Sequence, residues 1–298
     1  MQVIILYSAV VLIWGSTWIA ISYQLGTVPE ELSIAYRFSL ASLALFVYAL
    51  LTRRKIGIPL KLYPMVIVQG VFLFSLNYFF VYRAANYITT GLIAVVFSLI
   101  VLFNAYFERL FFKTPVDSRF LLASALGLLG ISLVFWPEVS AFSLKDRTVA
   151  GVLLIIVSVA SASLGNMAAI FNMRQKLPVV ALNAHAMGCG ALLSAAYAIF
   201  IGREISFSTD PEYLWSLLYL AIFGSAVAFG CMLSLLRQIG AARAAYTSVL
   251  FPIVALIIST VVEDYQWSTP AFAGIALALL GNWLALSKNR KQQTSKTI

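Results

Sequence analysis

Residues 3–22 read VIILYSAVVLIWGSTWIAIS, a run without a single charged side chain. A helix of about 20 residues rises roughly 30 Å, which matches the hydrocarbon thickness of a bilayer. No Lys or Arg precedes the run, and the first basic residue of the chain is Arg37. Because a secretory signal peptide opens on a positively charged segment, we interpret this run as a retained membrane-spanning helix.

Apolar runs of the same kind recur along the chain, and short connectors with Pro, Gly and charge separate them. The chain is 62% hydrophobic and only 10% charged, whereas about a quarter of the residues of a soluble domain are charged. We therefore expect an all-α integral membrane protein that is embedded in the lipid bilayer. The expected spans are residues 3–22, 32–52, 62–84, 87–106, 119–136, 149–171, 179–201, 213–235, 243–262 and 270–286.

Basic residues are distributed unevenly between alternate connectors. With the N-terminus placed inside, the inner loops and the tail hold fifteen Lys and Arg residues and the outer loops hold four. Since cytoplasmic loops retain positive charge, we expect a multi-pass protein of the cell inner (plasma) membrane with both termini cytoplasmic. Residues 288–298 then form a basic cytoplasmic tail. The net charge of +9 follows from this loop pattern, so no nucleic-acid partner is expected.

The two halves of the chain share a spaced motif. Glu108 is followed seven residues later by Pro115, and Glu263 is followed by Pro270 at the same spacing. We interpret residues 1–143 and 144–287 as two five-helix repeats. An odd number of spans inverts the second repeat relative to the first, so the sequence predicts ten transmembrane helices in two inverted repeats around a central cavity. This architecture is typical of secondary transporters, which bind solute near the midplane.

A family resemblance rests on several of these residues. The run Trp14-Gly15-Ser16-Thr17-Trp18, together with Pro29, Arg37 and the Glu–Pro–Gly endings of both halves, resembles the drug/metabolite transporter superfamily and its EamA-type branch most closely. The resemblance covers nearly the whole chain. It implies the ten-helix inverted-repeat fold and the export of amino acids or related metabolites, as in YddG-like proteins. The second half has Gly165-Asn166 in place of the tryptophan-rich opening, so the halves need not contact solute equally.

Candidate solute-binding residues are polar and aromatic side chains inside the spans, because such groups usually face the protein interior. Tyr78 and Tyr82 lie one helical turn apart on one face of the third span, with Asn77 beside them. Each candidate also has a structural alternative: interfacial anchoring, packing, or a hydrogen bond between helices. The full set is Trp14, Trp18, Arg37, Asn77, Tyr78, Tyr82, Ser98 and Asn166.

Two titratable residues are open to different interpretations. Arg37 could anchor a solute carboxylate or phosphate, or it could extend outward to Glu30 or Glu31, and we favour the outward extension. His185 is the one histidine of the sequence, and we expect it to be a hydrogen-bonded structural residue. Among the prolines, Pro252 is expected to kink the ninth span near the cavity.

The motifs of other functional classes are missing from the sequence. No metal-ligand spacing, catalytic cluster or phosphate-binding loop is present, so we expect neither an enzyme nor a cofactor or metal. The leading hypothesis is a secondary transporter that exports small metabolites, amino acids first, by alternating access. A carrier of another solute class (a sugar, a nucleotide-like anion or a drug) is the alternative, and a channel is less favoured. Gly274 and Gly281 could pack helices within the chain or form a dimer seam, so a monomer or a homodimer is expected.

The predicted orientation can be tested by cysteine labelling. Single cysteines introduced after Trp136 and near Asp210 should react with an impermeant thiol reagent applied outside intact cells, because both positions lie in predicted outer loops. A cysteine near Lys291 should react only after the membrane is permeabilised. The reverse pattern would reject the orientation.

Overall fold

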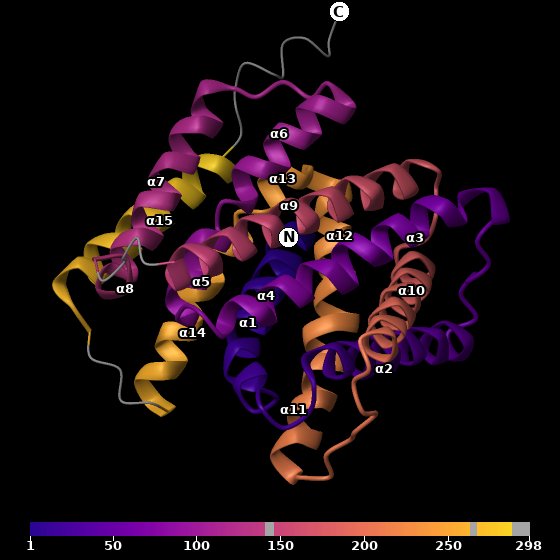
Figure 1. Cartoon of the computed structure of the whole chain (residues 1–298). Coiled ribbons are helices and arrows are strands. Elements are labelled where there is room, and N and C mark those ends of the chain that lie inside the picture. The colour runs from indigo at the N-terminus through magenta and orange to yellow at the C-terminus, as the bar shows by residue number, and fades with distance from the viewer. Residues whose placement is uncertain (141–145, 263–266, 288–298) are drawn as a thin grey trace, which may run out of the picture.

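The computed structural model describes residues 1–140, 146–262 and 267–287, and the regular elements in these ranges are helices (Figure 1). Nine helical segments within them are long and apolar enough to cross a membrane. The tenth, α7 (Ser118–Val134), is an apolar helix of 17 residues. The expected all-α membrane fold with ten spans is confirmed.

The first five spans are α1, α2, a third span with a wide central turn, a fourth span in two pieces, and α7. Their bounds are α1 (Gln2–Ser22), α2 (Glu30–Leu51), η1 (Leu60–Leu62), α3 (Tyr63–Val71), η2 (Phe72–Leu76), α4 (Asn77–Ala85), α5 (Thr90–Phe97) and α6 (Ile100–Phe112), followed by α7 and the short α8 (Trp136–Ser140).

The second half repeats this order with a break in its fourth span. Its elements are α9 (Asp146–Arg174), α10 (Val179–Phe200), α11 (Pro211–Ala221), η3 (Ile222–Val227), α12 (Ala228–Ile239), α13 (Ala241–Ala244), α14 (Thr247–Val262) and α15 (Thr269–Leu286). Pro252 lies inside α14, as expected. The predicted boundary at 143/144, the basic tail and Glu263 fall outside the described residues.

The fourth span departs from its expected bounds of 87–106. It is interrupted after α5, where the Ser98 hydroxyl donates to the Val95 carbonyl at 2.6 Å, and α6 then continues to Phe112. The expected bounds placed Glu108 just beyond the end of the span. Instead its carboxylate accepts the backbone N–H of Ala242 at 3.0 Å, at the start of α13, so the free donors of a helix N-terminus satisfy the charge.

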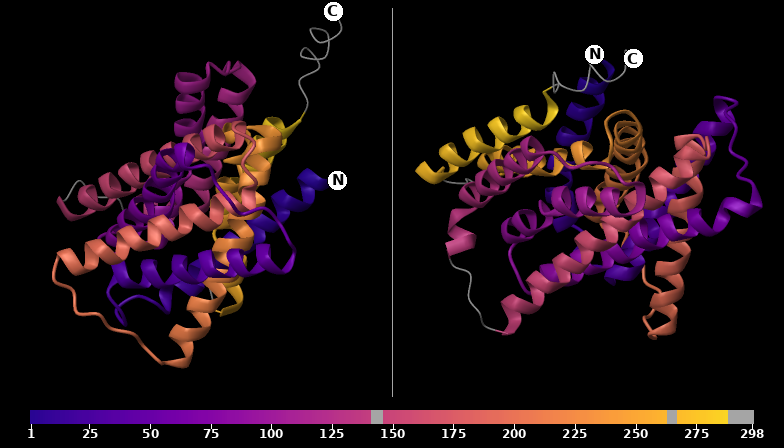
Figure 2. Two further views of the ribbon diagram at one scale, coloured as in Figure 1. Left: turned by 90° about the vertical axis from the view of Figure 1, so that its right-hand side faces the viewer. Right: turned by 90° about the horizontal axis from the view of Figure 1, so that it is seen from above.

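The packing of the helices follows the repeat. The fifth span packs along the tenth (α7 with α15) and the second along the seventh (α2 with α10). The first span, α1, contacts α12 and α14 of the second half, and α9 makes the matching contacts with α4 and α6 of the first half. Figure 2 shows the start of α1 and the end of α15 on the same side of the assembly, as an even number of crossings requires.

Each third span contains a π-helical turn at the equivalent place, Phe72–Leu76 in the first half and Ile222–Val227 in the second. A π-helical turn leaves backbone groups without their usual α-helical partners and is frequent at functional sites. In η2 the opposite half supplies a partner, since Ser161 of α9 donates to the Phe72 carbonyl at 2.7 Å. Ser194 of α10 also bonds the Ser75 hydroxyl at 2.8 Å.

The α7–α15 contact depends on glycines. A Cβ atom added at Gly274 would lie 2.5 Å from the Gly130 carbonyl oxygen, and one added at Gly281 would lie 2.7 Å from the Ala123 carbonyl oxygen. Figures 1 and 2 show the two helices side by side. The sequence left open whether Gly274 and Gly281 pack helices within the chain or form a dimer seam. The structure shows that they pack against α7 within the chain.

This close contact predicts a sharp difference between two glycine substitutions. Gly274→Ala should lower the free energy of unfolding by about 1–3 kcal/mol, because the two helix backbones must separate. Gly230→Ala in α12 is the matched control, since nothing lies within 4 Å of its added Cβ, and helix propensity should make it neutral or slightly stabilising. Thermal melting of both variants in the same detergent measures this. Equal melting temperatures would contradict the proposed role of the glycine contact.

Candidate functional site

A cavity of about 100 Å³ lies where helices of the two halves meet. By this measure a single water needs at least about 10–15 Å³, so the cavity is large enough for water or for a small solute in its place. Helices α1, α2, α4, α6, α9, α12 and α14 all contribute to the wall, and most of the wall is apolar. Its polar and aromatic side chains are Trp14, Thr17, Arg37, Asn77, Tyr78, Phe97, Asn166, Phe229, Thr247, Ser248 and Phe251.

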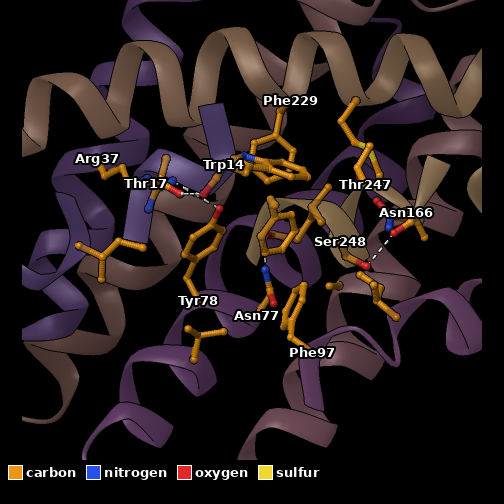
Figure 3. A pocket seen from close by; sticks show the side chains of 18 residues that line it. Trp14, Thr17, Arg37, Asn77, Tyr78, Phe97, Asn166, Phe229, Thr247 and Ser248 are labelled. Carbon is orange, nitrogen blue, oxygen red and sulfur yellow. Dashed lines mark hydrogen bonds between the residues drawn. The ribbon is translucent and has the colours of Figure 1, made fainter. Parts of the chain in front are cut away.

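The cavity has two chemically different ends. Figure 3 shows Arg37 at one end, whereas Asn166 and Thr247 lie at the other. The rings of Trp14 and Phe229 lie between these ends and meet edge to face, with their centroids 5.0 Å apart. A solute inside would therefore meet a cation, then aromatic surface, then neutral hydrogen-bonding groups.

Arg37 faces inward, so the favoured expectation that it extends outward to Glu30 or Glu31 is wrong. Its side chain is 1% exposed. Nε donates to the Ser225 hydroxyl at 2.9 Å, and one terminal nitrogen lies 3.5 Å from the Gly224 carbonyl of the π-helical turn η3. Glu31 is instead 3.6 Å from Arg203. These contacts turn the guanidinium away from Glu30 and Glu31 and toward the second half.

One terminal nitrogen of Arg37, NH1, is buried without a hydrogen-bond partner. The guanidinium lies 4.7 Å from the centre of the Tyr78 ring and donates a long bond of 3.4 Å to the Tyr78 hydroxyl. Among the described residues that line the cavity, none is acidic. A buried cation with neutral neighbours is costly, and an anionic group in the cavity would offset that cost.

Trp14 lines the cavity, as the sequence predicts. Its indole N–H donates to the Gly224 carbonyl at 3.1 Å. The first and second spans of the first half therefore both contact η3, α1 through Trp14 and α2 through Arg37. In the same way, α9 and α10 of the second half contact η2 through Ser161 and Ser194. The structure does not describe the side chain of Trp18.

Asn77 and Asn166 also line the cavity, and each is tied to a serine or asparagine behind it. The Asn77 side-chain oxygen accepts from Ser158 at 2.7 Å. Asn166 donates to the side-chain oxygen of Asn104 at 3.4 Å, and that oxygen also accepts from Ser163 at 2.6 Å. These bonds fix the orientation of both amides. Asn166 therefore has both of the roles considered from the sequence, because it bonds a neighbouring helix and also faces the cavity.

Three other singled-out residues lie away from the cavity. Tyr82 is buried one turn beyond Tyr78, and its hydroxyl bonds Gln24 at 3.4 Å. Ser98 is fully buried and bonds its own helix. The Nδ1 atom of His185 bonds the Tyr63 hydroxyl and its Nε2 atom bonds the Ile56 carbonyl, both at 2.9 Å. The expectation of a hydrogen-bonded structural histidine is confirmed.

Several lining residues were missed by the sequence analysis. Thr247 and Ser248 follow the basic loop residue Arg243 closely, so they resembled the polar start of a span, but α13 and the break after it carry the chain into the cavity. Phe97 and Phe229 lie in uniformly apolar runs, where nothing in the sequence distinguishes a cavity-lining ring from a lipid-facing one. The wide turn η3, which presents Gly224 to Arg37, had no sequence signal that we used.

Comparisons with known proteins agree with this architecture. The model of the EamA-like transporter family matches residues 1–136 and again residues 149–287. An "Uncharacterized transporter" of Archaeoglobus fulgidus is 23% identical over 284 residues, covering 95% of this chain and 98% of that protein. The "Uncharacterized inner membrane transporter YedA" of Escherichia coli (strain K12) is 26% identical over 293 residues, covering 94% of this chain and 91% of that protein.

A solved structure superposes on the chain with a TM-score of 0.79 at 19% identity and covers 95% of both chains, which shows a shared fold. The family model matches each half of the chain separately, in agreement with the repeated packing of the helices. The chain therefore belongs to the EamA-like transporter family and is a multi-pass membrane transporter for a small-molecule substrate.

Proposed function

We propose that this transporter carries small metabolites that combine a carboxylate with an apolar part, with amino acids and related compounds as the leading class. The observation that carries the proposal is Arg37, a buried cation with an unpaired nitrogen at a cavity whose described lining has no acidic residue. Charge-assisted hydrogen bonds to arginine are strong, and its planar fork matches the geometry of a carboxylate.

The rest of the cavity supports the same solute class. Trp14 and Phe229 offer aromatic surface beside the cation, which suits an apolar side chain. Asn166 and Thr247 at the far end offer neutral polar atoms but no second cation, so a highly charged anion such as a nucleotide is a poor match. A cationic drug would face Arg37 without an acidic partner in the described wall.

The proposed mechanism is alternating access. The cavity lies between two repeats of the same fold, and transporters of this architecture expose a midplane site to each side in turn. The resemblance to metabolite exporters gives export as the proposed direction, with the predicted cytoplasmic termini setting the inner side. Pro252 in α14 lies one turn beyond the cavity residue Ser248 and is our candidate for a flexing point.

The proposal predicts that transport requires the solute's negative charge. Purified protein in proteoliposomes should show counterflow of leucine or phenylalanine but not of the corresponding amides, which lack the carboxylate. Arg37→Gln should weaken transport of the acid by roughly 10- to 100-fold, since a hydrogen bond to a charged group contributes about 1.5–3 kcal/mol. Arg203→Gln is the matched control, because it removes a cation at the outer end of the protein, outside the cavity.

Melting temperatures of the two arginine variants separate a binding defect from misfolding. A folded Arg37→Gln protein that transports the acid at the wild-type rate would contradict the proposal. Equal counterflow of acids and amides would contradict it as well, because the charge of the solute would then be irrelevant.

Two buried tyrosines, Tyr78 inside the cavity lining and Tyr7 outside it, give a second test. Tyr78→Ala should weaken the apparent affinity for a transported amino acid about fivefold or more, or about 1 kcal/mol, because the ring lines the cavity and supports Arg37. Tyr7→Ala removes a buried tyrosine outside the cavity lining that bonds Asn282 at 2.6 Å, so it should lower thermal stability instead and leave the affinity of the folded fraction unchanged. A Tyr78→Ala protein with normal affinity would move the site away from α4.

A further inference from the structure

A second, wholly apolar hollow of about 340 Å³ lies between α3, α6 and α9, separate from the central cavity. Phe111 from α6, Phe72 and Met65 from the third span, and Leu164 and Phe171 from α9 define it. Every residue in its described lining is hydrophobic, and Phe111 and Phe171 are exposed on the surface. We call this feature the α3–α6–α9 groove. Its walls suit a hydrocarbon chain and offer nothing to a polar solute.

The groove follows two antiparallel helical segments, α3 and α9. Asn172 bonds the Met65 carbonyl at 3.1 Å, and Ser161 bonds the Phe72 carbonyl at 2.7 Å, so α3 and α9 run side by side in opposite directions. Seven residues separate Met65 from Phe72, which is a rise of about 10 Å. This length is about one third of the roughly 30 Å hydrocarbon thickness of a bilayer.

Three basic residues lie within one turn of groove residues, at the end of the groove where Met65 and Phe171 are found. Arg174 ends α9 one turn beyond Phe171, and its guanidinium is 4.0 Å from the centre of the Phe112 ring. Lys113 caps α6 beside it, and Lys61 lies one turn before Met65. The side chains of all three are exposed. The ion pair found among the described residues joins Arg203 and Glu31, so it neutralises none of these cations.

We propose that the α3–α6–α9 groove binds one anionic phospholipid of the leaflet at this end, the predicted cytoplasmic one. An acyl chain lies against Phe72, Phe111 and Leu164, and the phosphate contacts Arg174 and Lys113. Basic residues clustered at the cytoplasmic end of membrane helices attract anionic headgroups, and the groove supplies the adjoining apolar contact. Charge at the rim and hydrocarbon below it match a lipid, whereas a soluble phosphate would meet only the rim.

Native mass spectrometry of the full chain in detergent tests the proposal with two probe lipids. Phosphatidylglycerol and phosphatidylcholine with identical acyl chains are titrated separately, and adduct formation is measured. We expect several-fold more phosphatidylglycerol adduct in the wild type and a several-fold loss in Arg174→Gln. Arg54→Gln is the matched control, because Arg54 is also exposed on the predicted inner side and also stacks on an aromatic ring, Tyr48, at 5.3 Å, but outside the groove.

A second variant pair tests the groove itself without changing charge. Val68→Phe fills the lining and should reduce phosphatidylglycerol adducts, whereas Ile67→Phe adds the same bulk at an exposed neighbour outside the lining and should not. Equal losses in Arg174→Gln and Arg54→Gln would overturn the proposal in favour of general surface charge. Full binding by Val68→Phe, or equal wild-type adducts with both lipids, would overturn it too.

Discussion

In a bilayer the backbone has no water to bond, so every N–H and C=O group must find a partner inside the protein. The ten spans meet this requirement as helices, and the two π-helical turns occur where another part of the chain supplies partners. Ser161 serves the π-helical turn η2 in this way, and Trp14 and Arg37 serve η3. Both turns lie where the two halves pack against each other, and the candidate solute cavity lies at the same contact.

The two halves use the same scaffold but different chemistry. The second helix of the first half presents Arg37 to η3, whereas the second helix of the second half presents Ser194 to η2. One side of the pseudo-symmetric centre therefore carries a charge and the other carries hydroxyl groups. Arg37 lines the cavity, whereas Ser194 does not. The cavity has a cationic end from α2 and a neutral polar end from Asn166 and the start of α14.

Local periodicity predicted much of the fold and part of the site. Hydropathy located the spans because each one must cover the same thickness of lipid. The polar side chains of Asn77 and Tyr78 within a span identified two residues that do line the cavity. The orientation of Arg37 could not be predicted in this way. Glu30 and Glu31 are its neighbours in sequence, but its partners, Ser225 and Gly224, lie 188 and 187 residues away.

The same limit explains the other errors. Tyr82 is the same residue type as Tyr78 and lies one turn along the helix. Only the three-dimensional structure shows that its hydroxyl donates to Gln24 and that it does not line the cavity. Ser98 looked like a polar contact in mid-span, but it bonds the carbonyl at the end of α5. Each residue bonds another group of the protein, and a single sequence does not distinguish that role from solute contact.

The uncompensated guanidinium of Arg37 has an electrical consequence. In an alternating-access cycle, part of the membrane voltage falls across the cavity on one side in one state and on the other side in the next. Moving one elementary charge through the full voltage changes the free energy by about 2.3 kcal/mol per 100 mV. A bound monoanion cancels the charge of Arg37, whereas a zwitterion leaves it in place. The empty and loaded carriers therefore respond differently to the membrane potential, and the net charge of the solute determines which half of the cycle the voltage drives.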